Sequence, residues 1–221
     1  MRVERVLIGG FLSVFLIAIS AHATIYDLTS SADSTVSITG TFSDMASTVE
    51  SDANSGLFDV IDYKVGVDTV NQEVWIEHLE LQYNPIMQFD FPSFSQTIKI
   101  RNLDLQMGPT AKVKYSYDSS KGGYYFDICE DTDITANSQI DTGSGWEDDT
   151  INISSKIIDS QIFFDGSGNV KTVWTHFVGG WWDYESGIWQ TWNVQGLVVP
   201  EPASITIMFF AISSMLIRRK K

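Results

Sequence analysis

The stretch Ala111-Lys-Val-Lys-Tyr-Ser-Tyr-Asp-Ser-Ser-Lys-Gly-Gly-Tyr-Tyr-Phe-Asp-Ile-Cys129 decides the fold class. Its first part alternates Val113, Tyr115 and Tyr117 with polar residues, which is the period-two pattern of a half-buried strand. Residues 118–123 are polar and end in two glycines, and an aromatic run follows them. The pattern therefore predicts two antiparallel strands joined in a hairpin.

Other runs with strand-like alternation lie on both sides of this hairpin. Strands are predicted at 34–42, 57–67, 73–83, 98–105, 151–164, 170–178 and 188–194, with turns such as 68–71 and 165–169 between them. Residues 45–56 and 130–150 are polar and are interpreted as turn-rich segments, the first with one turn of helix. A helix is the alternative for the Glu-rich residues 73–81, but their aromatic and β-branched content favours a strand. The alternation slips at Arg101, which predicts a β-bulge there.

About ten short runs at this spacing, without an amphipathic helix or a βαβ alternation, indicate an all-β protein. The expected architecture is an antiparallel β-sandwich or jelly roll. Residues 24–196 are enough for one domain with its own core and too few for two.

The N-terminus has the features of a secretory signal peptide, assigned to residues 1–23. Arg2 and Arg5 are followed by an apolar run at 6–19, and Ala21 and Ala23 form the small-x-small pattern that signal peptidase cleaves. The alternative is an uncleaved signal anchor.

The chain ends in three successive parts. These are Pro200, Glu201 and Pro202, an apolar run at 203–217, and the cations Arg218, Arg219, Lys220 and Lys221. Because flanking cations stay in the cytoplasm, the preceding domain is expected on the other side of the membrane. As a helix the apolar run is about 22 Å long, shorter than the roughly 30 Å hydrocarbon core, so the expected transmembrane helix is a marginal anchor.

These three parts resemble the PEP-CTERM sorting signal of Gram-negative bacteria, here residues 197–221. An inner-membrane enzyme of the exosortase type recognises and removes that signal. The resemblance implies exosortase as a processing partner, in addition to the signal peptidase indicated by Ala21 and Ala23, and a transient inner-membrane intermediate. It also implies delivery to the cell surface or the extracellular exopolysaccharide matrix. An ordinary tail anchor is the alternative.

Charge and cysteine content limit what the domain does. Between the two end segments, eight Lys and Arg stand against 26 Asp and Glu, a formal net charge of about −18. Such a surface repels nucleic acid, which excludes that class of partner, and keeps an exported protein soluble. Cys129 is the single cysteine, so no intrachain disulfide forms. It is interpreted as a buried, unreactive thiol.

Tryptophans cluster near the end of the domain. Trp181, Trp182, Trp189 and Trp192 follow Trp174 within 19 residues, and flat aromatic faces on a sheet are suited to binding sugar rings. The alternative is packing in the core. Because Trp189 and Trp192 have opposite parity, at most one of them faces solvent in a regular strand.

Acidic residues gather at 130–150. Oxygen ligands in loops are what Ca²⁺ binds, so Asp131, Asp133, Asp148 and Asp149 are candidate ligands, the alternative being solvated loop charge. Apart from this Ca²⁺ hypothesis no cofactor is expected. Because no catalytic motif is found, a non-enzymatic protein is expected.

The sequence therefore predicts an exported protein with a structural or adhesive role in the exopolysaccharide or biofilm matrix. The alternative is a carbohydrate-binding module that uses the tryptophan cluster between Trp174 and Trp192. A secreted hydrolase is a more distant alternative.

Overall fold

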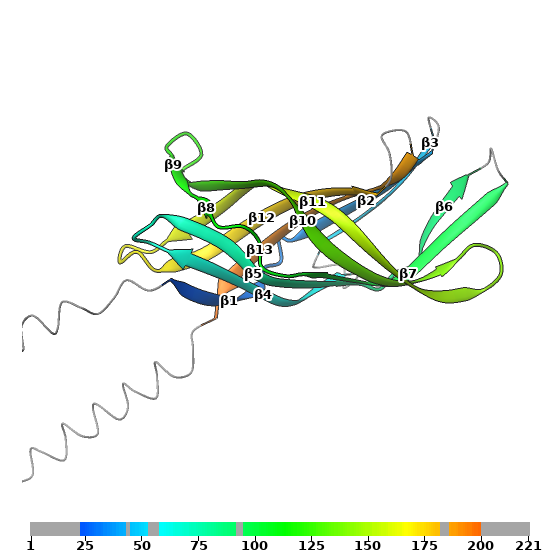
Figure 1. Cartoon of the computed structure of the whole chain (residues 1–221), viewed down its shortest axis with the longest axis horizontal. Helices are drawn as coiled ribbons and strands as arrows, with labels where there is room; N and C mark the ends of the chain where they lie inside the picture. Colours follow the sequence, from blue (N-terminus) through cyan, green and yellow to red (C-terminus); the bar gives the residue numbers. More distant parts are fainter. Residues whose placement is uncertain (1–22, 43–44, 53–57, 92–94, 182–185, 200–221) are drawn as a thin grey trace, which may run out of the picture.

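The computed structural model describes residues 23–42, 45–52, 58–91, 95–181 and 186–199 (Figure 1). In these ranges all regular elements are strands. They are β1 (Thr24–Ser30), β2 (Thr35–Phe42), β3 (Met45–Asp52), β4 (Phe58–Asp68), β5 (Glu73–Tyr83), β6 (Met87–Phe91), β7 (Gln96–Met107), β8 (Val113–Lys114), β9 (Ser116–Asp118), β10 (Gly123–Asp141), β11 (Trp146–Phe164), β12 (Val170–Trp181) and β13 (Ser186–Val198). The described residues include no helix with the length and apolar character needed to cross a membrane.

The strands form one antiparallel sheet that closes on itself. Eight strands in the order β1-β4-β5-β7-β10-β11-β12-β13 form a barrel, because β1 pairs back onto β13 with Leu28 opposite Val198. β2 pairs with the first part of β13 and carries β3, and β6 pairs with the first part of β7. Figure 1 shows β3 and β6 together at one end of the molecule, away from the start of β1.

The all-β class and the antiparallel pairing are confirmed. The expected β-sandwich or jelly roll is not found, because the described strands belong to a single sheet and not to two packed sheets. The strand periodicity is the same in both architectures, so it did not distinguish them.

Large side chains fill the interior of the barrel. Tyr63 in β4, Ile128 in β10, Phe177 in β12 and Trp192 in β13 are all at most 2% exposed. The ring of Trp192 stacks on that of Phe177 with 6.0 Å between their centroids. Each such burial stabilises the fold by about 1.5–3 kcal/mol relative to an exposed side chain.

Two polar segments that were expected as turns are strands. Residues 45–52 form β3, and residues 130–150 belong mostly to β10 and β11, with a turn at 142–145. In the second segment Ile134 and Ala136 are buried while Asp131 and Asp133 are exposed, so the outer face of the strand is polar. The charges indicated a loop, but they belong to the solvent face of a sheet.

A β-bulge explains why the buried residues of β5 do not alternate uniformly along the strand. Ile76 lies opposite Val65 and His78 lies opposite Lys64, so Glu77 is an extra residue in the ladder. Val74 and Ile76 are buried before this bulge, and the buried positions after it are Leu79, Leu81 and Tyr83. The extra residue shifts which parity faces inward.

The slip predicted at Arg101 is also confirmed. The register between β7 and β10 shifts between Arg101 and Asp104, and Asn102 adopts a positive φ of 52°. A third such site lies in β11, where Asp159 has φ 50° and the register with β12 shifts between Ile158 and Gln161.

Barrel closure depends on a close approach at Gly196. A Cβ atom there would lie 2.8 Å from the ring of Tyr63 and 2.7 Å from the Cβ of Leu28. Tyr63 is fully buried and its hydroxyl is hydrogen-bonded to that of Thr175, so its ring has little freedom to move. Burial raises the pKa of Tyr63, which therefore remains a neutral hydrogen-bonding group. Gly196 was expected to lie at the boundary of the domain, but β13 continues through Leu197 to Val198.

Gly196→Ala should lower the free energy of unfolding by about 1–3 kcal/mol, because the added methyl overpacks the Tyr63 ring. Urea denaturation followed by tryptophan fluorescence measures the change. Gly166→Ala is the matched control, since a Cβ there meets nothing within 4 Å. Equal stability of the two variants would contradict this account of closure.

Candidate binding site

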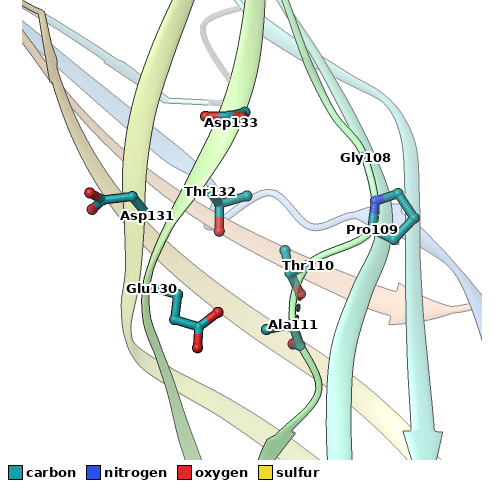
Figure 2. A pocket seen from close by; sticks show the side chains of 8 residues that line it. All are labelled: Gly108, Pro109, Thr110, Ala111, Glu130, Asp131, Thr132 and Asp133. Carbon is teal, nitrogen blue, oxygen red and sulfur yellow. Dashed lines mark hydrogen bonds between the residues drawn. The ribbon is translucent and has the colours of Figure 1, made fainter.

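A cavity of about 340 Å³ opens in the barrel wall between two segments. It is lined by residues 108–111 on one side and by residues 130–133 of β10 on the other (Figure 2). This volume lies within the range of small-ligand pockets. We call this opening the wall gap.

The wall gap arises where β10 loses its neighbours. β7 pairs with β10 only from Ile134 onward, and β9 pairs only with residues 123–125. The connecting segment turns toward β5 instead: the N–H of Thr110 donates to the carbonyl oxygen of Ile76 at 2.9 Å. The N–H of Ile76 in turn donates to the Thr110 hydroxyl at 3.0 Å. Residues 126–133 therefore have no strand partner on this edge within the described chain.

A wide bulge in β10 shapes the same place. Ile128 lies opposite Ile157 and Thr132 lies opposite Ser155, so residues 129–131 face the single residue Lys156. Cys129 is exposed, because it directly follows Ile128, whose side chain faces the core. The interpretation of Cys129 as a buried thiol is wrong: its strand-like surroundings did not show which face of the strand is buried.

The side chains around the wall gap have different directions. In Figure 2 the carboxylate of Glu130 points toward Thr110 and Ala111, whereas that of Asp131 points away from them. Thr132 is 8% exposed, lines the cavity, and its hydroxyl has no hydrogen-bond partner among the described residues. The hydroxyl oxygen itself is not among the fully buried atoms that lack a partner, so a molecule in the cavity can reach it.

The four predicted calcium ligands do not form one site. Asp133 lies opposite Ser154, whereas Asp148 and Asp149 lie opposite Gln139 and Ser138. The six residues from position 133 to position 139 of β10 separate the two pairs by about 20 Å. In the described ranges no group of three or more His, Cys, Asp or Glu residues is arranged to hold a metal.

Asp148 takes part in a side-chain network that the sequence did not indicate. Gln139 donates through Nε2 to Asp148 Oδ1 at 2.9 Å and accepts from Arg101 Nε at 2.9 Å. The Arg101 guanidinium lies over the ring of Trp146, 4.1 Å from its centroid. The adjoining turn is stabilised by Asp141, whose pKa is lowered because its carboxylate accepts the N–H groups of Gly143 and Gly145.

The tryptophan cluster divides between core and surface. Trp192 is fully buried and donates through Nε1 to the side-chain oxygen of Gln190, whereas Trp189 is 38% exposed and Trp174 is half-buried. The parity prediction is confirmed, because Trp192 faces the core and Trp189 faces solvent. Trp182 and the side chain of Trp181 lie outside the described residues.

Trp174 and Trp189 share the outer face of β12 and β13. Trp174 lies opposite Gln195 and Gly180 lies opposite Trp189. The pairs between them are His176 with Asn193 and Val178 with Thr191, so most of the side chains that separate the two indoles are polar. From position 195 to position 189 of β13 the distance is about 20 Å. Burial lowers the pKa of His176, with an opposing effect from Asp159, so the imidazole is neutral at physiological pH. We call this surface the β12–β13 face.

The processing residues are only partly described. Ala23 is exposed and directly precedes β1. Ala21 and the sorting-signal residues from Pro200 to Lys221 lie outside the described ranges. Comparison of the chain with protein-family models, curated proteins and solved structures found no match.

Trp192→Ala should lower the free energy of unfolding by about 3–5 kcal/mol, because it leaves a cavity beside Phe177. Trp189→Ala should change it by about 1 kcal/mol or less, because that indole is partly in solvent. Thermal and urea unfolding of both variants check the difference. A Trp192→Ala protein as stable as wild type would refute its assignment to the core.

Proposed function

We propose that this chain is an exported, non-enzymatic module of the cell surface or exopolysaccharide matrix, delivered by an exosortase-type enzyme. The sequence features that support this are the signal peptide at 1–23 and the Pro-Glu-Pro, apolar and basic parts of the tail. The apolar part of the tail is proposed as a short transmembrane helix that holds the protein until the tail is removed.

The observation that carries the proposal is the position of the two ends of the barrel. β1 begins at Thr24, the residue after the proposed cleavage site, and β13 ends at Val198. The N–H of Val199 donates to the carbonyl oxygen of Asp27 at 2.9 Å, so the two ends lie side by side. Leader and tail would therefore both attach at one place on the barrel, and the rest of the barrel would project away from the membrane.

The distribution of charge and packing also supports an outer-surface role. Between the end segments there are 26 acidic and only eight basic residues, and the resulting negative charge favours solubility outside the cell. In the described barrel the cavity beside Ile38, Met87 and Gln190 has a volume of about 20 Å³, which is enough for about one water molecule. The interior beside these three residues is therefore closely packed.

Sorting predicts a specific mature product. In a Gram-negative host with a working exosortase, the protein should lose residues 1–23 and the terminal cations, and it should keep those cations in a host without the enzyme. Intact-protein mass spectrometry of the envelope and extracellular fractions measures this. The double variant Pro200→Ala, Pro202→Ala is the matched control and should keep its tail. A product that retains residues 218–221 beside an active exosortase would contradict the proposal.

Carbohydrate binding is a second candidate function. It is supported by the β12–β13 face, where Trp174 and Trp189 stand about 20 Å apart on one face with amide and hydroxyl side chains between them. Aromatic faces bind the apolar faces of sugar rings, and amides and hydroxyls bind their hydroxyl groups. An extended polysaccharide would contact both indoles.

Trp174→Ala and Trp189→Ala should each weaken binding to a polysaccharide identified on a glycan array by about tenfold, or about 1.4 kcal/mol. Trp146→Ala is the control, because that half-exposed indole lies on β11 beside Arg101 and away from the β12–β13 face. Affinity electrophoresis of the folded variants gives the ratios. Equal losses in all three variants, or no glycan bound by the wild type, would exclude this function.

A further inference from the structure

We propose that the wall gap binds an extended, basic segment of a partner protein, which adds a short strand to the free edge of β10. This goes beyond the matrix function proposed above, since it identifies a second surface and a chemical class of partner.

Part of β10 presents an unpaired strand edge. Residues 126–133 of β10 have no strand partner on the side toward β7 and β9 in the described chain. The backbone N–H and C=O groups of such an edge are a template for pairing with another extended chain. Peptides that bind in this way obtain affinity from main-chain hydrogen bonds and specificity from side-chain positions.

The size of the wall gap fits a short peptide. Its cavity of about 340 Å³ is bordered by residues 130–133, which extend over about 13 Å. On its opposite side the N–H of Thr110 is already bonded to the carbonyl oxygen of Ile76, so β10 is the edge available for pairing. A segment of about four residues would occupy this length.

The charge of the wall gap selects a basic partner. Glu130 points across the gap, and Asp131 and Asp133 lie on either side of Thr132 along the strand. None of these three carboxylates forms an ion pair with a described residue. Of the nearby cations, Lys156 lies opposite the bulge on β11 and the ammonium of Lys112 lies over the ring of Trp75, 4.3 Å from its centroid.

Thr132 gives a second, independent indication of a ligand. The residue is more than nine-tenths buried, yet its hydroxyl lines the cavity without a protein partner in the described ranges. The hydroxyl oxygen is not among the fully buried atoms without a partner, so it is accessible from the cavity. A main-chain or side-chain group of a bound peptide would satisfy this hydroxyl.

A metal ion fits the same residues less well. The carboxylates of Glu130 and Asp131 point in different directions in Figure 2. Calcium requires six to eight oxygen ligands that converge on one point. A peptide strand requires an unpaired strand edge, a cavity that admits its side chains and complementary charge, and the wall gap provides all three.

The experiment measures binding of fluorescein-labelled Lys-Val-Lys-Val-Lys to the purified full-length chain by fluorescence anisotropy at 150 mM salt. We expect saturable binding, at least tenfold weaker binding of the same peptide N-methylated at alternate residues, and no binding of Glu-Val-Glu-Val-Glu. Equal affinity for the methylated peptide would overturn the proposal, because it would show attraction to the acidic surface without strand pairing.

The variants localise the site. Glu130→Gln and Thr132→Val should each weaken binding by about five- to tenfold, whereas Glu147→Gln, an exposed acid on β11, should leave the affinity unchanged. Glu130 is exposed, so its variant tests the site even if Thr132→Val lowers stability. The same affinity in Glu130→Gln and wild type would place binding elsewhere. If 1 mM CaCl₂ displaced the labelled peptide while the N-methylated peptide still bound, the wall gap would be a cation site. This result would also overturn the proposal.

Discussion

The pairing of β1 with β13 is the constraint on which the rest of the structure depends. Three residue pairs, from Leu28 opposite Val198 to Ser30 opposite Gly196, convert an open sheet into a barrel. Without them both strands would present free edges, which promote aggregation. The pairing requires glycine at position 196, because the Tyr63 ring occupies the space of a side chain there. It also joins the two ends of the domain, so any attachment through leader and tail acts at one place.

Bulges make closure compatible with a filled interior. At Glu77, at residues 102–103 and near Asp159, an extra residue changes which parity points inward. The long strands β5, β7 and β11 thereby keep apolar residues inside although their sequences do not alternate uniformly. Strand curvature and twist increase at such positions, which a closed sheet requires.

The wall gap follows from unequal strand lengths. β10 has 19 residues, whereas β7 pairs with its second part and β9 with three residues at its start. The free edge between them carries Glu130, Asp131 and Asp133, so the discontinuity in pairing coincides with a concentration of negative charge. Sequence reasoning singled out Asp131 and Asp133 but associated them with Asp148 and Asp149, because distance along the chain was the only measure of proximity. It did not indicate Thr132 or Thr110, which are unremarkable strand and turn residues until their neighbours are known.

What the sequence alone determined is local. Period-two alternation and turn residues such as Asp118 and Asp165 specified most strands, the bulge near Arg101, and the opposite environments of Trp189 and Trp192. Only the tertiary structure decided that the strands form one closed sheet, that residues 130–150 are strands with a charged outer face, and that Cys129 is exposed. The reason is physical: a strand's alternation records which face is buried, whereas its partner is selected by hydrogen bonds and packing between residues as distant as Leu28 and Val198.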